Sequence, residues 1–466
     1  MRTMLHLPYG HEEIFTGELE RTIPYHRMYG KQYCLPALTL YEESEMEELR
    51  TAAEAVDRIY RKVMQFVQDY LPDSYLVEQL GIHPGLLAAI RRDDAPQGIT
   101  RQDWILGADG LKCIENNADT PTGIPEAAYL ERELLRLQNE ATKVTYAGPS
   151  RGMDETLRRM FKTVMNHYER QGLGTEAVFT CYDWHLEDRH NTEYLMRMCR
   201  EAGFTVCFAP LHELEIVPGE GLYHRDRQVH ILYRLYPLEY LIHDEEEESG
   251  VAVGQALMDL AAARRLGLIN PPRQMIAQSK GFTATLWSLY ERNEQTPEYC
   301  GFRLFDDEEL NWIERYLLPT YFEPAPFEQN GTPYVAKGYW GREGKGTALH
   351  EGTKADLQTA AAAMPPSLDG LGEADRPLTE EEQEAEQIAA YYENQPKIYQ
   401  RLWPMQAAEV LTEEGRYAGY LLTGVFVIGG TFAGVLPRIG EKVTGDMAFY
   451  CAAAVREADA GIKQDN

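Results

Sequence analysis

Two short neighbouring segments carry polar side chains at alternating positions, a spacing that can assemble a metal site. The first segment holds Arg101 and Asp103, and the second holds Glu115 and Asn117. Because strand residues two apart share a face, each pair projects to one side. With a three-residue loop, 108–110, Asp103 would lie across from Glu115, and Arg101 would lie across from Asn117. A two-residue loop would shift the register, and the two polar faces would no longer coincide. Two carboxylates and an amide oxygen suit Mg²⁺, with an exposed polar hairpin as the alternative.

A glycine-rich segment, 337–346, follows a short apolar run and could fold over a phosphate group. Its glycines, among them Gly341 and Gly344, let backbone amides approach a ligand closely, and Lys337 supplies a positive charge. The GxxxxGK[ST] pattern of a Walker A loop is absent. A flexible hairpin tip is therefore the alternative interpretation.

Three further positions stand beside expected elements. Lys280 precedes the helix expected at 283–291, where an ordinary surface lysine is the alternative. Arg438 ends an apolar strand, so its charge must be exposed at the end of the sheet or paired. The segment 400–403, which includes Gln400 and Leu402, could offer backbone hydrogen bonds and an apolar wall to a planar ring. Simple core packing is the other interpretation of that segment.

The periodicity of the chain places these residues on a mixed α/β scaffold. Between 176 and 242, strands alternate with a helix, which predicts a small parallel, Rossmann-like lobe, although no GxGxxG motif follows its first strand. The uncharged stretch 417–437 turns at Gly429-Gly430 and predicts two core strands rather than a membrane helix. We expect the first forty residues to be irregular and a last helix to follow residue 445. Helical spacing predicts helices at 42–70, 85–92, 126–139, 154–170, 191–203, 254–266 and 283–291.

Composition excludes several classes of protein. The chain has 466 residues and a mass of 53.2 kDa, which predicts about three domains or lobes. A net charge of −29, from 45 basic and 74 acidic side chains, argues against nucleic acid or an anionic membrane as a partner. The charge either serves solubility or favours a cationic substrate. Seven dispersed cysteines form no CxxC pair, which predicts no disulfide framework and no zinc site and fits a cytoplasmic location. The oligomeric state is not set by the sequence.

Four motifs together give the sequence a family resemblance. They are R-x-D followed by L-K-x-x-E-x-N-A-D, then K-x-x-x-x-x-LWSL, then K-x-x-x-GR-x-G, and finally IYQ-x-LW, between about Arg101 and Arg438. In this order and spacing they resemble the synthetase domain of glutathionylspermidine synthetase, an ATP-grasp ligase family. The carboxylates precede the lysines here, similar to the circularly permuted arrangement of that family.

The resemblance implies a fold and a division of the chain. The implied fold is α/β, an ATP-grasp fold with a Rossmann-like pre-ATP-grasp lobe. Residues 1–150 would hold the N-terminal helical segment and the metal-binding hairpin, and 151–270 the substrate lobe. Residues 271–466 would form the nucleotide-binding lobes, with an acidic insertion at 351–396 that is either mobile or a surface helix.

The same resemblance assigns roles to individual residues. Arg101 would lie beside the transferring phosphoryl group, and Arg438 matches the second active-site arginine of the family. The implied Mg²⁺ ligands are Asp103, Glu115 and Asn117; the implied ATP contacts are Lys280, Lys337, Gly341, Arg342, Gly344, Gln400 and Leu402.

The substrate positions depart from the family pattern. Glu187 and Asp188 resemble the paired acids that contact polyamine and glutathione, and Thr120 stands where the family has a serine. Leu235 replaces an expected threonine, so a hydroxyl contact to glutathione is missing. The resemblance implies an ATP-dependent carboxylate–amine ligase that forms an amide through an acyl phosphate. Its substrates would be a glutathione-like peptide and a polyamine; the alternatives are the same chemistry on amino acids or small peptides, or a degenerate nucleotide-binding protein.

Overall fold

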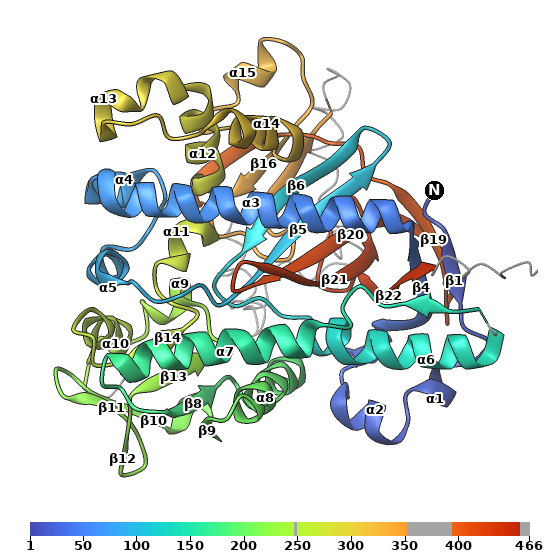
Figure 1. Ribbon diagram of the computed structural model, residues 1–466, viewed down its shortest axis with the longest axis horizontal. Helices are drawn as coiled ribbons and strands as arrows, with labels where there is room; N and C mark the ends of the chain where they lie inside the picture. The colour runs from blue at the N-terminus through green and yellow to red at the C-terminus, as the bar shows by residue number, and fades with distance from the viewer. Residues whose placement is uncertain (143, 247–248, 352–393, 457–466) are drawn as a thin grey trace, which may run out of the picture.

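The computed structural model describes residues 1–142, 144–246, 249–351 and 394–456, which form a mixed α/β protein with several sheets (Figure 1). The acidic stretch expected at 351–396 lies almost entirely outside these ranges. Among the helices within them, none has both the length and the apolar character that a membrane span requires.

The largest sheet combines strands from both ends of the chain. Its order is β1-β4-β22-β21-β20-β5-β6, with β19 paired to β20 and β7 paired to β22. As the sequence predicts, β20 and β21 are buried apolar strands joined at Gly429 and Gly430, which both have positive φ. The strands span Met4–His6 (β1), Cys34–Tyr41 (β4), Ile99–Gly107 (β5), Gly110–Asn117 (β6), Tyr146–Ala147 (β7), Ala407–Thr412 (β19), Gly415–Ile428 (β20), Thr431–Gly440 (β21) and Phe449–Arg456 (β22).

The β5–β6 hairpin has the expected pairing but reaches it by a different route. Its loop contains two residues, 108–109, so the expectation of a three-residue loop is wrong. A β-bulge opposite the step from Asp103 to Trp104 takes up one extra residue of β6, and Asp103 therefore still pairs with Glu115. The shift of register that a two-residue loop would cause is cancelled by this bulge.

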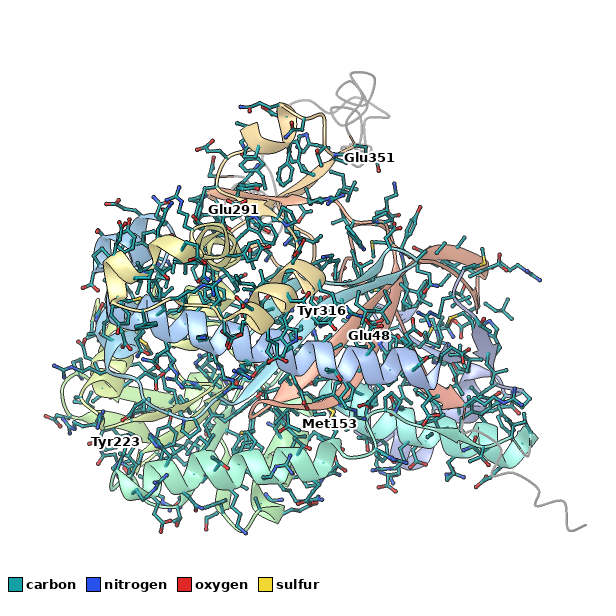
Figure 2. The ribbon with its side chains drawn as sticks, turned by 45° about the horizontal axis from the view of Figure 1, so that its top comes forward. Glu48, Met153, Tyr223, Glu291, Tyr316 and Glu351 are labelled. Carbon is teal, nitrogen blue, oxygen red and sulfur yellow. The ribbon has the colours of Figure 1, made fainter. Side chains whose placement is uncertain are left out.

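Helix α3 (Glu43–Tyr70) runs the length of the large sheet on one face (Figure 1). Its buried positions recur at helical spacing and include Leu49, Val56 and Val63. On its other side lies α14 (Asp307–Tyr316), and Figure 2 shows Glu48 of α3 close to Tyr316. The helix thus lies between the large sheet and α14.

The shorter elements of the first 142 residues are α1 (His11–Ile14), α2 (Gly17–Thr22), β2 (Arg27–Met28), β3 (Lys31–Gln32), α4 (Asp73–Glu78), α5 (Leu87–Arg92) and α6 (Glu131–Thr142), which a π-helical turn (Glu126–Leu130) precedes.

A second, parallel sheet confirms the lobe expected from the strand–helix–strand pattern. Its order is β14-β13-β8-β9, and all its neighbours are parallel. A separate three-stranded sheet, β10-β11-β12, continues from it (Figure 1). The elements are α7 (Met153–Arg170), β8 (Glu176–Thr180), α8 (Leu186–Glu201), β9 (Thr205–Phe208), β10 (Leu214–Val217), β11 (Gly221–His224), β12 (Arg227–Val229), β13 (Ile231–Arg234), α9 (Leu238–Leu241), α10 (Val253–Ala262) and β14 (Gly267–Ile269).

A small antiparallel sheet, β15-β18-β16-β17, lies on the other side of the large sheet's β5–β6 hairpin from most of the parallel lobe (Figure 1). Figure 2 shows the same separation between Glu351, just after β17, and Tyr223 on β11. Its strands span Thr320–Tyr321 (β15), Tyr334–Gly338 (β16), Thr347–His350 (β17) and Lys397–Arg401 (β18); the adjoining helices are α11 (Gln274–Gln278), α12 (Gly281–Glu291), α13 (Pro297–Cys300) and α15 (Ala325–Glu328).

Two expectations about the ends of the chain are wrong. The last helix expected after residue 445 is the strand β22, which lies between β4 and β21. The opening forty residues are also not irregular, because they supply β1 and β4 to the same sheet. In both cases pairing with distant strands decides the local conformation, which a local pattern does not show.

Candidate active site

A cavity of about 770 Å³ lies where the hairpin, the small antiparallel sheet and the parallel lobe meet. Most residues singled out from the sequence line it, although they come from segments far apart in the chain. Lys280 and Gly341 are not among the lining residues, but both contact residues that are. The sequence candidates in the lining are Arg101, Asp103, Glu115, Asn117, Thr120, Glu187, Asp188, Leu235, Lys337, Arg342, Gly344, Gln400, Leu402 and Arg438.

Two arginines converge on Asp103, which is 5% exposed. Its Oδ1 atom lies 3.0 Å from Nη2 of Arg438 and 3.4 Å from Nε of Arg101. Burial alone would raise the pKa of Asp103, but the two guanidinium groups outweigh it and the pKa is lowered. Gly424 on β20 makes room for this cluster, because a Cβ there would lie 3.0 Å from Cδ of Arg101.

The lysines approach the same hairpin from the other side. Nζ of Lys280, at the start of α12, lies 3.0 Å from Oε1 of Glu115. Lys337 on β16 donates hydrogen bonds to the Ile114 carbonyl at 3.0 Å and to Oε1 of Gln400 at 2.8 Å. Burial lowers the pKa of Lys337 to about 8, although Glu115 acts to raise it. Glu115 is thus paired with Lys280, and Lys337 is held beside it against the same hairpin.

The glycine-rich segment folds tightly at the edge of the cavity. Lys280 donates a hydrogen bond to the Gly341 carbonyl at 2.5 Å. Gly344 has a φ of +75°, and a Cβ there would lie 2.6 Å from Cγ1 of Val443. Only glycine therefore fits position 344 without a shift of the loop.

Replacing Gly344 with alanine should open this loop. We expect a loss of roughly 1–3 kcal/mol of local stability from the left-handed backbone, together with weaker binding of the nucleotide that the family resemblance implies for this loop. Gly152 is a matched control, because it does not have a positive φ and a Cβ there would meet nothing within 4 Å. Kinetics and thermal unfolding of both variants test the expectation; equal effects of the two substitutions would contradict it.

Glu187 and Asp188 lie in the first turn of α8. The backbone N–H of Asp188 donates a hydrogen bond to Nδ1 of His185, the N-cap residue of α8, and the same nitrogen lies 3.3 Å from Oδ1 of Asp188. Burial, with the charges of Glu126 and Asp188, raises the pKa of Glu187 to about 7. Glu126 itself is fully buried and accepts hydrogen bonds from the hydroxyls of Tyr25 and Tyr33, each at 3.1 Å.

The hairpin residues suit a hard divalent cation together with phosphate groups. Asp103 Oδ1 is buried and makes no aligned hydrogen bond, and neither do Nε of Arg101 and Nε of Arg438. No cluster of three or more His, Cys, Asp or Glu side chains that could hold a metal occurs among the described residues. Mg²⁺ is usually bound by one or two carboxylates, waters and substrate phosphates, so this sparse oxygen set fits it.

Four charged residues of this region escaped the sequence analysis. Glu239 pairs with Arg342, and Glu126 lies behind Glu187. Arg234 is fully buried and pairs with Asp119, which fixes the parallel lobe to the end of the hairpin. Asp119 belongs to the L-K-x-x-E-x-N-A-D motif and could have been found there, but Glu126 and Glu239 carry no local signal.

Comparison with models of known families shows which family the chain belongs to. Residues 19–365 match the model described as glutathionylspermidine synthase preATP-grasp. The chain belongs to this family. The chemistry of this family therefore guides the interpretation of the cavity.

Two similar proteins illustrate the range of the likeness. A protein of Haemophilus influenzae named "putative acid–amine ligase" is 25% identical over 264 residues, which cover 56% of this chain. The match covers 57% of that relative, so the chain spans little more than half of its length. The glutathione synthetase-like effector of Globodera pallida, at 11% identity, covers 89% of this chain and 88% of its own with a TM-score of 0.54. That likeness shows a shared fold only.

Proposed function

We propose that the protein is an ATP-dependent carboxylate–amine ligase that works through an acyl phosphate. The observation that carries this proposal is the convergence of Arg101, Arg438 and Lys337 on the hairpin carboxylates inside one cavity. Phosphoryl transfer needs positioning and neutralisation of charge, and these side chains supply both. The family and the name of the Haemophilus influenzae relative support the same chemistry.

The nucleotide side is assigned to the hairpin and the small antiparallel sheet, an ATP-grasp arrangement. Asp103, Glu115 and Asn117 would hold Mg²⁺, which when bound neutralises phosphate charge. Lys280 and Lys337 would bind the ATP phosphates, with the segment 337–346 folded over them. Gln400 and Leu402 would line the adenine pocket, which Trp403 and Leu318 extend.

The acyl side is assigned to the region between the hairpin and α8. Arg101 would orient the transferring phosphoryl group beside the substrate carboxylate, and Arg438 would stabilise the oxyanion that forms when the amine attacks. Glu187 and Asp188 would hold the ammonium form of the amine. Thr120 and Leu235 would contact the acid substrate, a glutathione-like peptide in the first instance.

The division of the chain follows from these roles. We assign the metal-binding hairpin to a unit at 1–150 and the substrate lobe to 151–270. The nucleotide-binding lobes would occupy 271–466. Because β20 of the last unit lies beside β5 of the first, the hairpin is completed by strands from the end of the chain.

Phosphate release from ATP, measured with the full chain against panels of carboxylates and amines, tests the function. Hydroxylamine added with ATP and each carboxylate would trap an acyl phosphate as a hydroxamate, without any need for the correct amine. Release with glutathione and spermidine would support the glutathionylspermidine reaction, and release with other pairs would assign different substrates. No phosphate release and no hydroxamate with any pair would contradict the ligase and leave a nucleotide-binding protein.

Lys337→Ala should abolish stabilisation by nucleotide. A ligand present at 100 times its Kd stabilises a protein by about 2.7 kcal/mol, and the variant should lose most of this because a buried cation facing the phosphates is gone. Thermal unfolding with and without Mg²⁺–ADP measures the loss. Lys162→Ala, at an exposed position of α7, is the control; an equal nucleotide shift in both variants would argue against the role of Lys337.

A further inference from the structure

An ion pair between Arg342 and Glu239 ties the glycine-rich segment to the parallel-sheet lobe. Nε of Arg342 donates to Oε1 of Glu239 at 2.8 Å, and Nη2 of Arg342 contacts the same oxygen. Nη1 of Arg342 donates to Oγ1 of Thr120 at 3.3 Å, just beyond the hairpin. One guanidinium group therefore connects three parts of the chain that meet at the cavity.

The hydrogen bonds of Arg342 show that Glu239 supports Arg342, and that Arg342 still has donors for a ligand. A guanidinium has five N–H groups, and these three contacts leave two of them for another acceptor. Arg342 lines the cavity, whereas Glu239 does not. Glu239 therefore acts on the cavity from behind, through Arg342.

The cost of Glu239 argues for a role beyond stability. Glu239 is 5% exposed, and its Oε2 atom has no hydrogen-bond partner. An unpaired buried carboxylate oxygen costs free energy, and an apolar pair is often as stable as a buried ion pair. Glu239 does fix the orientation of the Arg342 guanidinium group, which lies over the Tyr240 ring with 5.8 Å between Cζ and the ring centroid.

We propose that Glu239 is a positioning residue that holds Arg342 over the cavity, so that the glycine-rich segment closes against the substrate lobe. In this arrangement Lys280 anchors the segment at Gly341, and Glu239 anchors it at Arg342, the next residue. The expected effect of Glu239 on kcat rests on the proposed ligase function. The expected effect of Glu239 on the conformation of the segment does not depend on that function.

Kinetics of Glu239→Gln test the catalytic consequence. Glutamine keeps the size and one acceptor oxygen but removes the charge, so kcat should fall about tenfold with a smaller change in KM for ATP. Glu239→Asp should restore part of kcat, because the charge is kept. In the double variant with Arg342→Ala, Glu239→Gln should add nothing further, since Glu239 acts through Arg342. Wild-type kinetics of Glu239→Gln, or effects that multiply in the double variant, would overturn the proposal.

Limited tryptic digestion tests the closed segment without any substrate. Cleavage after Arg342 and Lys345, identified by mass spectrometry, should be at least threefold faster in Glu239→Gln than in the wild type. Glu215→Gln, an exposed glutamate of the same lobe, is the matched control and should leave the rate unchanged. Equal rates at both sites in Glu239→Gln and the wild type would overturn the positioning role. A protein without ligase activity would instead contradict only the proposed function.

Discussion

Replacing Asp103 with asparagine should lower ATP-dependent phosphate release by about 10³-fold. The substitution keeps the size and one oxygen of the side chain but removes the charge that faces Arg101 and Arg438. Loss of one preorganised electrostatic group commonly costs about 10²–10³-fold, and here a proposed Mg²⁺ ligand disappears at the same time. The expected loss is therefore at the upper end of that range.

The same substitution should also destabilise the fold. Two buried guanidinium groups would lose their shared counter-charge, and burial, together with the proximity of Arg438, already lowers the pKa of Arg101 although Asp103 acts to raise it. Breaking a buried pair costs about 3–5 kcal/mol, and asparagine should recover part of this by accepting hydrogen bonds. Activity must consequently be measured below the unfolding temperature of the variant.

Asp109→Asn is the matched control for Asp103→Asn. It makes the same chemical change in the exposed loop of the same hairpin, so it should leave phosphate release and thermal unfolding unchanged. Phosphate release by a folded Asp103→Asn variant within tenfold of the wild type would contradict the metal site and the electrostatic role together.

The hairpin shows how far the sequence alone determines this site. Alternating polar residues correctly predict that Asp103 and Glu115 pair and that Arg101 lies beside Asn117. The sequence predicts a three-residue turn that ends at Gly110, since a two-residue turn would shift the register and separate the faces. A β-bulge resolves the conflict: β6 carries one extra residue opposite the step from Asp103 to Trp104, and no local pattern in the sequence marks it.

Local composition fails where distant strands decide the conformation. The sequence after residue 445 contains the run CAAAV, which has high helix propensity. Nevertheless the segment pairs with β4 and β21 as the strand β22, and Ala452, Ala453 and Ala454 are completely buried there. Small side chains are needed at that position in the sheet, and their helix propensity is overridden by packing.

The partners of the charged residues are also invisible in the sequence. The resemblance assigns Arg342 to ATP, but nothing in its neighbourhood predicts that Glu239 holds it. Likewise, Glu126 affects Glu187 only because α8 packs against the turn that follows the hairpin, where Asn191 accepts hydrogen bonds from the backbone of Gly123. Residues that touch a ligand can be inferred from motifs, whereas residues that act through others require the fold.

Glu187→Gln should lower amide formation by about 10²-fold while sparing the trapping reaction with hydroxylamine. The carboxylate is expected to bind the ammonium group and to accept its proton, so that the neutral nitrogen can attack the acyl phosphate and release phosphate, a contribution typical of a general base. Hydroxylamine is largely uncharged at neutral pH and does not need this help. Equal losses in both reactions would contradict the role of Glu187 in the amine step.

The pH dependence of the wild type gives a second test of Glu187. Its pKa of about 7 means that the carboxylate form increases as the pH rises through 7, so kcat/KM for the amine should rise over the same interval. The charged and titratable groups around it are Glu126, Asp188 and His185, and the two acids act to raise its pKa. In Glu187→Gln this rise should disappear, whereas Glu215→Gln should retain it.

The same group should make the native state less stable as the pH rises. The pKa of Glu187 is higher in the folded protein than in the unfolded chain, where a glutamate has a pKa near 4.3, so its stabilising contribution is complete below that value and is lost as the pH rises through about 7. Glu187→Gln removes this penalty and should raise the unfolding temperature at pH 8 by more than at pH 5. A variant that is less active yet more stable at high pH indicates that the carboxylate is retained for binding and proton transfer rather than for folding. An unfolding temperature that falls equally at both pH values would show that the side chain is a structural part of α8.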